Sequence, residues 1–224
     1  MRPLVVLVLI ALATGASAQE RVMPARGVFL VAEPSIEGGP FYESVVLVLA
    51  HGKEGTLGLI LNRRTRIPFS EVLPELDVGE PSQKLYFGGP VALEGVLVLF
   101  RSETPPEGAE TVMEGVYYSG DRNVLEKLLK GEEPSDELRL FIGHSGWAAG
   151  QLDAELLRGS WDVLRADVST VFRTEPESLW ELLSMSGRIF ARSSRPSHLG
   201  QWHLDGVEDA GLGADVDEVV EPVE

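Results

Sequence analysis

One stretch, residues 139–161 (RLFIGHSGWAAGQLDAELLRGSW), constrains the fold of this chain more than any other. It begins with an apolar run at 140–142, and two glycines and a tryptophan follow within 143–147. Glycines between a strand and a helix usually lie where the backbone comes close to another segment and a side chain would clash. The pattern predicts a buried strand, a glycine-rich turn over 143–147 and a helix from about 148 to 158, which Gly159 ends.

The composition bounds the size and class of the fold. Roughly 170 to 180 of the 224 residues remain when two unusual chain ends are set aside, which suits one domain with a sizeable core. No segment repeats at a fixed period, which argues against a repeat architecture. The formal net charge of −16 argues against a nucleic-acid partner, because phosphate binding needs clustered lysine and arginine. Cysteine is absent, which excludes disulfides, thiolate metal sites and a catalytic thiol.

The first 18 residues have the pattern of a signal peptide. Arg2 precedes ten apolar residues at 4–13, and the Ala-Ser-Ala at 16–18 has the spacing of a cleavage site. A membrane-spanning helix needs ~20 apolar residues, so this run is short for an anchor. We predict cleavage between Ala18 and Gln19, export to the periplasm, and no stable membrane insertion afterwards. An uncleaved N-terminal anchor is the alternative.

The remaining chain divides into three parts. Residues 19–26 form an N-terminal segment, 27–190 the folded domain and 191–224 a disordered acidic tail. The last twenty residues carry eight carboxylates and no lysine or arginine. A solvated end without a task is the simple interpretation. In the alternative, the tail folds back on a basic patch or screens a basic partner; the patch consists of Arg188, Arg192 and Arg195.

The first half of the domain is rich in predicted strands. Apolar or alternating runs occur at 28–32, 44–50, 56–61, 85–87, 96–100 and 112–118. The second and third runs are separated by about five residues of turn composition, which favours a hairpin. Near-continuous apolarity indicates that the first strands are covered on both faces.

Helices dominate the second half. A short helix after Pro68 is limited by Pro74. Asp121 is a suitable N-cap for a helix over 122–130. A capping box formed by Thr174 and Glu177 begins a last helix over 175–185, and Gly187 stops it.

Five blocks of sequence carry a family resemblance. In chain order they are GVFLVAEP (27–34), SVVLVLAH with GTLGLILNR (44–63), YFGGPV (86–91), FIGHSGWAAGQLDAEL with Trp161 (141–161), and VFRTEPESLWELLSMSG (171–187). Together they resemble the bacterial YqgE/AlgH family, also known as UPF0301 or DUF179. The resemblance implies an α+β fold, a single domain in which a curled, partly barrel-like mixed sheet has helices packed outside. The strand-rich first half and helix-rich second half agree with that fold.

The resemblance implies no established enzymatic activity, and one branch of the family is linked to transcriptional regulation. This sequence departs from the family in three places. His144 stands where the family motif has tyrosine, and Arg64 stands where an Asn-Arg-Pro motif has proline. Family members are generally cytosolic, whereas this chain begins with a predicted signal peptide, and an exported protein does not meet the chromosome.

A nucleophile is the first kind of chemistry to consider. His144 and Ser145 lie in a turn that lacks the Gly-x-Ser-x-Gly spacing of a nucleophile elbow. A Ser–His–Asp triad drawn from Ser145 or Ser44 with His51 and Asp153 stays open, because the sequence does not determine its geometry. Packing at the strand–turn–helix joint is the simpler interpretation of the glycines.

Metal and phosphate sites find less support. The four histidines, His51, His144, His198 and His203, show no paired-ligand spacing, so we predict no metal and no cofactor. The sequence Gly88-Gly89-Pro90 is not followed by a helix with Lys-Ser/Thr, so it indicates a tight turn or bulge and no phosphate loop.

The remaining candidates are polar residues and tryptophans of the family motifs. Asn62 and Arg63 at a strand end, beside His51 across the hairpin, form the most plausible polar cluster, although capping the strand is the simpler role. Trp147, Trp161 and Trp180 are expected in the core or at its rim. The motif positions expected to be structural or to bind a ligand are His51, Gly58, Asn62, Gly88, Gly89, Pro90, Gly143, Gly146, Trp147, Gln151 and Trp161.

The sequence therefore predicts an exported, non-catalytic binding or regulatory interaction domain. Its partner is a protein or a small molecule whose identity the sequence does not indicate, and no catalytic residue is assigned. The first alternative is a periplasmic hydrolase that uses a cleft at the glycine-rich turns. The second is a cytosolic transcriptional regulator, which requires that the N-terminus is not a signal peptide.

Overall fold

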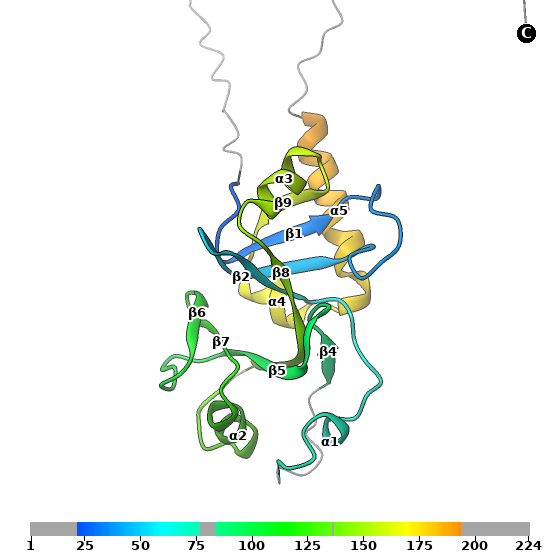
Figure 1. Ribbon diagram of the computed structural model, residues 1–224. Coiled ribbons are helices and arrows are strands. Elements are labelled where there is room, and N and C mark those ends of the chain that lie inside the picture. Colours follow the sequence, from blue (N-terminus) through cyan, green and yellow to red (C-terminus); the bar gives the residue numbers. More distant parts are fainter. Residues whose placement is uncertain (1–21, 77–83, 136, 194–224) are drawn as a thin grey trace, which may run out of the picture. The chain divides into compact units, whose positions relative to one another are not determined.

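The computed structural model describes residues 22–76, 84–135 and 137–193, with side chains as far as residue 185 (Figure 1). The predicted signal peptide, its cleavage site and the acidic tail from residue 194 onward lie outside the described residues. The strands are β1 (Val28–Ala32), β2 (Val45–Gly52), β3 (Gly55–Ile60), β4 (Leu85–Phe87), β5 (Val91–Arg101), β6 (Glu110–Met113), β7 (Val116–Ser119), β8 (Glu137–Trp147) and β9 (Trp161–Arg165). The helices are α1 (Phe69–Val72), α2 (Arg122–Lys130), α3 (Gln151–Leu157), α4 (Val168–Arg173) and α5 (Pro176–Ser193).

All described strands belong to one sheet. Its order is β6-β7-β5-β8-β3-β2-β1-β9, with antiparallel neighbours throughout, and β4 pairs parallel with β8 off this path. The helices pack outside the sheet (Figure 1). The predicted α+β class with a mixed sheet is confirmed, and the sheet is open, not a closed barrel.

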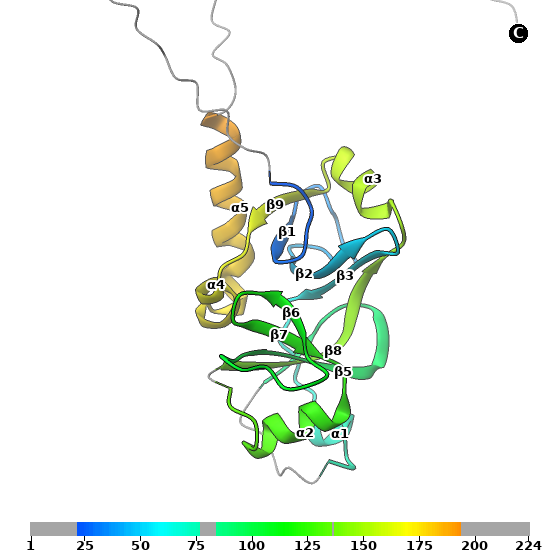
Figure 2. The same cartoon turned by 90° about the vertical axis from the view of Figure 1, so that its left-hand side faces the viewer.

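Strand β8 joins the two halves of the sheet. Its first part pairs with β5, from Arg101↔Glu137 to Val91↔His144, and its last three residues pair with β3, from Gly58↔Ser145 to Thr56↔Trp147. Figures 1 and 2 both show it running from the β5–β7 region to the β1–β3 region. The prediction of a turn over 143–147 was therefore wrong. The glycines lie within an extended strand that changes partners, and the helix begins only at Gln151.

Three glycines allow β8 to change partners. A Cβ on Gly89 would lie 2.4 Å from the carbonyl carbon of His144, and a Cβ on Gly143 would lie 2.4 Å from the carbonyl oxygen of Gly89. A Cβ on Gly88 would lie equally close to the carbonyl oxygen of Gly143. Gly88 N donates to Ile142 O at 2.8 Å, and Ile60 N donates to Gly88 O at 2.9 Å. The segment after β4 therefore lies directly against both β3 and β8, with no space for side chains.

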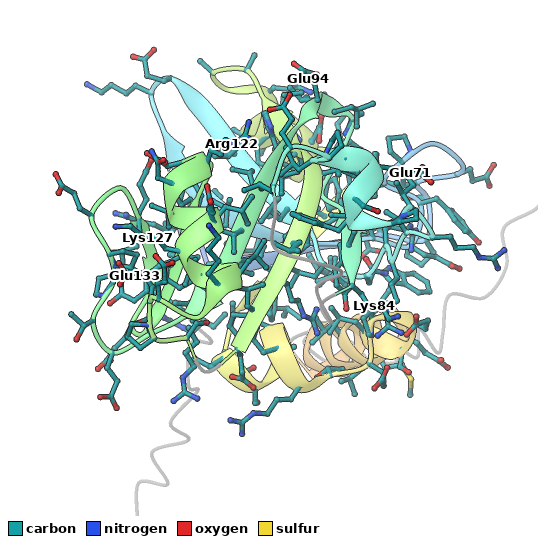
Figure 3. The ribbon with its side chains drawn as sticks, turned by 90° about the horizontal axis from the view of Figure 1, so that it is seen from below. Glu71, Lys84, Glu94, Arg122, Lys127 and Glu133 are labelled. Atoms are coloured by element: carbon teal, nitrogen blue, oxygen red, sulfur yellow. The ribbon has the colours of Figure 1, made fainter. Side chains whose placement is uncertain are left out.

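Three apolar clusters surround the sheet. Helices α4 and α5 bury Val171 and Leu179 against one face, where Phe141 of β8 lies. Helices α1 and α2 cover the other face of the β5–β8 region, and their charged residues Glu71, Arg122 and Lys127 are labelled in Figure 3. Helix α3 contributes Leu152 to a third cluster with the tryptophans Trp147 and Trp161. The expectation that these tryptophans lie in the core is confirmed.

Two further predictions of element bounds need correction, and one is confirmed. Residues 112–118 are not one strand but the hairpin β6–β7, because Gly115 adopts a φ of 73° and reverses the chain. The last helix does not end near residue 185 but continues through Gly187 to Ser193. The 122–130 helix is confirmed: Asp121 accepts a hydrogen bond from Asn123 N at 2.7 Å, and Gly131 ends the helix at a φ of 72°. Among the described helices, none is long and apolar enough to cross a membrane.

The close approach of Gly89 to His144 predicts that two glycine-to-alanine substitutions differ strongly in their effect on stability. Gly89→Ala should lower the free energy of unfolding by about 3 kcal/mol, because its Cβ meets backbone atoms that cannot rotate away and its φ of 146° disfavours a side chain. Gly146→Ala is the control, since a Cβ there comes no closer than 3.6 Å to its nearest neighbour. Urea unfolding of the two variants measures the difference, and equal midpoints would contradict the close contact.

Candidate functional site

Segments from three of the five sequence blocks meet at a groove of about 460 Å³. Its walls come from the end of β2, the turn and the start of β3 that follow it, the last part of β8 and the first residue of β5. The lining residues are Ala50, Glu54, Gly55, Thr56, Leu57, Val91, His144, Gly146 and Trp147. The antiparallel registers explain why these segments meet: Leu57 lies opposite Gly146, and Val91 lies opposite His144. The change of partners by β8 thus creates the site.

The imidazole of His144 forms one wall of the groove. The residue is half-buried, and this burial lowers the pKa of the imidazole below its usual value. His144 is therefore neutral at pH 7 and presents a ring to the groove without a charge. An uncharged ring beside Val91 suits contact with an apolar group.

Ser145 faces the interior and not the groove. Successive residues of a strand point to opposite faces, so Ser145 and His144 do not point toward each other. Ser145 is fully buried, and its hydroxyl donates to Gly88 O at 3.0 Å. β3 lies between the strands that carry His51 and Ser145, so their backbones are separated by about 10 Å. Asp153 is exposed on α3. The structure thus does not bring Ser145 together with His51 and Asp153, as the triad with Ser145 as nucleophile requires.

The polar cluster expected around Asn62 does not form. His51 pairs with Thr56 at the turn of the hairpin, where its Nδ1 lies 2.8 Å from the Thr56 hydroxyl. Asn62 lies at the opposite end, because an antiparallel hairpin places the residues after β3 beside the start of β2. There it accepts from Val45 N and donates to Glu43 O, both at 2.9 Å. The capping role expected for Asn62 is what the geometry supports.

A hydrogen-bonded unit beside the groove is centred on Glu155 of α3. Its Oε2 accepts from the indole nitrogens of Trp147 and Trp161, both at 2.9 Å. Gln151 Nε2 donates to the other carboxylate oxygen at 3.0 Å, and Gln151 Oε1 accepts from Ala148 N at 3.1 Å. The carboxylate therefore holds in place the tryptophan that lines the groove.

An aromatic group completes this unit. The rings of Trp147 and Trp161 meet edge to face with centroids 5.9 Å apart, and Phe41 contacts both, at 5.7 and 5.5 Å. Both tryptophans are buried. Such ring contacts add to the stability gained by burial alone. Trp147, Trp161 and Gln151 thus have structural roles, and only Trp147 also reaches the groove.

The other motif positions divide between packing and surface. Gly58 is buried, and a Cβ there would lie 2.6 Å from Val46 Cγ1, so it permits β2 and β3 to pack. Gly146 is exposed in the groove, and Pro90 is exposed immediately before the lining residue Val91. His198 and His203 lie outside the described residues. In the described part of the chain, no group of three histidine or acidic side chains could hold a metal ion.

Sequence reasoning missed two features of the site. Glu155 was not among the predicted site residues, although its i, i+4 spacing from Gln151 was a usable signal. Val91 lines the groove and Leu93 follows it on β5 beside Gly143, and their exposed fractions are 42% and 52%. These residues flank Ala92, which has a φ of 50° within an irregular part of the β5–β8 pairing. No local pattern indicates such a bulge.

Removing the charge of Glu155 should destabilise the domain. Glu155→Gln replaces a charged acceptor of two indole hydrogen bonds, so we expect the free energy of unfolding to fall by about 1–3 kcal/mol. The matched control is Asp153→Asn on the same helix, whose carboxylate is exposed, and it should change little. Urea unfolding followed by tryptophan fluorescence measures both. Equal losses in the two variants would contradict the indole–carboxylate unit.

The same carboxylate makes stability depend on pH. Burial raises the pKa of Glu155, but hydrogen bonds from Trp161, Trp147 and Gln151 outweigh burial and hold it below its usual value. A carboxyl with a depressed pKa stabilises the fold above the pKa of the unfolded chain, ~4.3, and this contribution is lost as the pH falls through the folded pKa. The stability difference between wild type and Glu155→Gln should therefore shrink between pH 6 and pH 3. A constant difference would show that the carboxylate is not the acceptor.

Comparison with known proteins agrees with this architecture. Residues 29–188 match the family model of the AlgH-like proteins, DUF179. A UPF0301 protein from Methylococcus capsulatus is 35% identical over 159 residues, which cover 69% of this chain and 87% of the relative. A UPF0301 protein from Chlorobium luteolum is 36% identical over 157 residues, which cover 70% of this chain and 82% of the relative.

Two solved structures share the fold. The solution structure of AlgH from Pseudomonas aeruginosa has a TM-score of 0.61 at 27% identity and covers 77% of this chain and 95% of its own. A crystal structure of a protein from Corynebacterium diphtheriae has a TM-score of 0.63 at 29% identity, and the match covers 74% of this chain and 88% of that protein. The resemblance predicted from the five blocks is confirmed, and the chain belongs to the AlgH-like family (DUF179, UPF0301).

Proposed function

We propose that the chain acts, after export, as a non-catalytic binding domain that receives an apolar side chain of a protein partner in the groove beside His144. Export is supported by the signal-peptide pattern of the first 18 residues. The binding role is supported by the groove, which the family motifs build and which has a neutral imidazole and aliphatic side chains on its walls.

The exposed rim of the groove is the observation that carries the binding proposal. Val91 and Leu93 expose 42% and 52% of their surface on a short bulged segment, next to a hollow whose wall includes the half-buried Leu57. Exposed aliphatic side chains gathered at a groove are typical of sites that bind another protein. The rim also has the acidic Glu54, so a partner segment that carries a basic residue beside its apolar side chain fits better than an acidic one.

Three polar groups at or near the groove are engaged in the fold. Ser145 is buried against Gly88 O, the imidazole of His51 is hydrogen-bonded to Thr56, and Glu155 holds two tryptophans. A general base or nucleophile must reach substrate, and these groups are committed elsewhere. No specific observation favours the hydrolase or the transcriptional regulator over the binding domain.

The export half of the proposal is tested by N-terminal sequencing of the native protein from fractionated cells. We expect a mature chain that begins at Gln19 in the exported fraction. An intact Met1 in the cytosolic fraction would contradict export and would leave the groove proposal standing on its own.

The groove is tested by photo-crosslinking in intact cells. A photoreactive residue at Leu93 should capture a partner, and the same residue at Leu157, which is 90% exposed on α3, should not. Val91→Asp should reduce capture from position 93 about tenfold or more, because a charge at the rim must be desolvated on binding. Leu157→Asp is the matched control and should leave capture unchanged. Equal capture from both positions, or capture that survives Val91→Asp, would overturn the groove as the binding site.

A further inference from the structure

A second and larger cavity, of about 710 Å³, lies far from the groove. Three segments that are distant in sequence form it: the end of β5, the turn between β6 and β7, and the connection from β9 to α4. The lining residues are Arg101, Ser102, Glu103, Met113, Glu114, Gly115, Tyr117, Ala166, Asp167 and Val168. Figure 2 shows α4 beside the β6–β7 hairpin. Val91 and Arg101 lie at opposite ends of β5, so the cavity and the groove are separate sites.

The cation at the cavity is neutralised from within the fold. Arg101 Nη1 lies 3.7 Å from Glu137 Oε2, and Arg173 Nε donates to the other oxygen of the same carboxylate at 3.0 Å. Arg101 lies opposite Glu137 in the β5–β8 register, which fixes this pairing. The guanidinium of Arg101 is therefore occupied by an internal carboxylate and is a poor receptor for a second anion.

The acids of the lining are not balanced in the same way. Glu103 and Glu114 form no ion pair within the described residues, and both are exposed at the cavity. Asp167 accepts from Thr170 N at 2.9 Å and from the hydroxyls of Ser169 and Thr170, and it keeps its negative charge. The lining residues carry one positive charge, on Arg101, and three negative charges, on Glu103, Glu114 and Asp167. The ion pair of Arg173 with Glu137 adds one charge of each sign, so an excess of two negative charges remains.

The rest of the lining is carbon-rich. Met113 and Val168 are aliphatic, and Tyr117 adds an aromatic ring, all three half-buried. Carboxylates beside aliphatic and aromatic surface suit a cation on a hydrocarbon chain, because the chain packs while the charge is paired. A bare metal ion suits the cavity less well, since the described residues contain no group of three ligands that could hold one. The excess of negative charge disfavours a phosphate or another carboxylate.

We propose that this cavity binds alkyl-ammonium or guanidinium groups, which reach it either as free polyamines or as lysine and arginine side chains of a polypeptide. The carboxylates of Glu103 and Glu114 pair with the cation, and the hydrocarbon chain lies against Met113, Tyr117 and Val168. This inference rests on the cavity alone and does not depend on export or on the groove.

Spermidine is the probe for the cation site, with the chain from residue 19 to residue 224 studied by calorimetry and by amide NMR. We expect saturable shifts of the amide of Gly115 and of its neighbours in the cavity. The double variant Glu103→Gln/Glu114→Gln should weaken binding roughly threefold to tenfold, since each exposed pair contributes modestly. Raising the salt concentration should also weaken the binding of spermidine to the wild type.

The control must separate a site from the general acidity of a chain of net charge −16. Glu71→Gln/Glu94→Gln removes the same number of charges from residues on α1 and at the other end of β5, both labelled in Figure 3. The control variant should bind spermidine as the wild type does. Equal weakening by both double variants, shifts spread over the whole acidic surface, or no binding would each overturn the proposal.

The two sources of the cation are separated by comparing ligands. The tripeptides acetyl-Gly-Lys-Gly-amide and acetyl-Gly-Arg-Gly-amide test side-chain recognition, and acetyl-Gly-Gln-Gly-amide is their neutral control. Tripeptides that bind as tightly as spermidine and compete with it indicate a docking site for a polypeptide. Spermidine binding at least tenfold tighter indicates a polyamine site. Binding of the neutral tripeptide equal to that of the lysine tripeptide would overturn recognition of the cation.

Discussion

The fold depends on a contact between two stretches of bare backbone. Gly88 and Gly89 lie directly against Gly143 and His144, and a Cβ on any of the three glycines would approach backbone atoms to 2.4 Å. This contact allows β8 to pair with β5 and β4 in its first part and with β3 in its last part, so that one strand belongs to both halves of the sheet. Side chains at this junction would separate the halves by the width of a methyl group or more, and backbone hydrogen bonds do not tolerate such a displacement.

The same contact shows where prediction from sequence succeeds and where it stops. The capping signals of Asp121 and Gly131 act within one helix, and the prediction of 122–130 was correct to the residue. The glycines at 143 and 146 also carried a signal, but a glycine marks a turn or a close backbone approach equally well. The partner segment lies more than fifty residues earlier in the chain, and no local pattern identifies it. The prediction of a turn failed for that reason.

The candidate site was likewise predicted only in part. Sequence motifs selected two residues that line the groove, Gly146 and Trp147, and one, His51, that is hydrogen-bonded to the lining residue Thr56, but they did not give the distances between them. Asn62 was grouped with His51, although the register of the hairpin places them at opposite ends. Glu155 escaped notice because its donors Trp147 and Trp161 are eight residues before it and six after it, and the strand–helix–strand geometry alone brings them together.

The hydrogen bonds of three reactive groups support the proposal of a binding domain. A hydroxyl, an imidazole and a carboxylate lie at or near the groove, as in many active sites, yet Ser145, His51 and Glu155 each make hydrogen bonds that hold backbone or side chains in place. A catalytic group needs an open side toward the substrate and a partner that tunes its proton affinity. Among the described residues, Val91 and Leu93 offer exposed aliphatic surface, and Glu103 and Glu114 offer exposed carboxylates. Aliphatic and charged surfaces select partners by burial and by charge, which are the means of a binding domain.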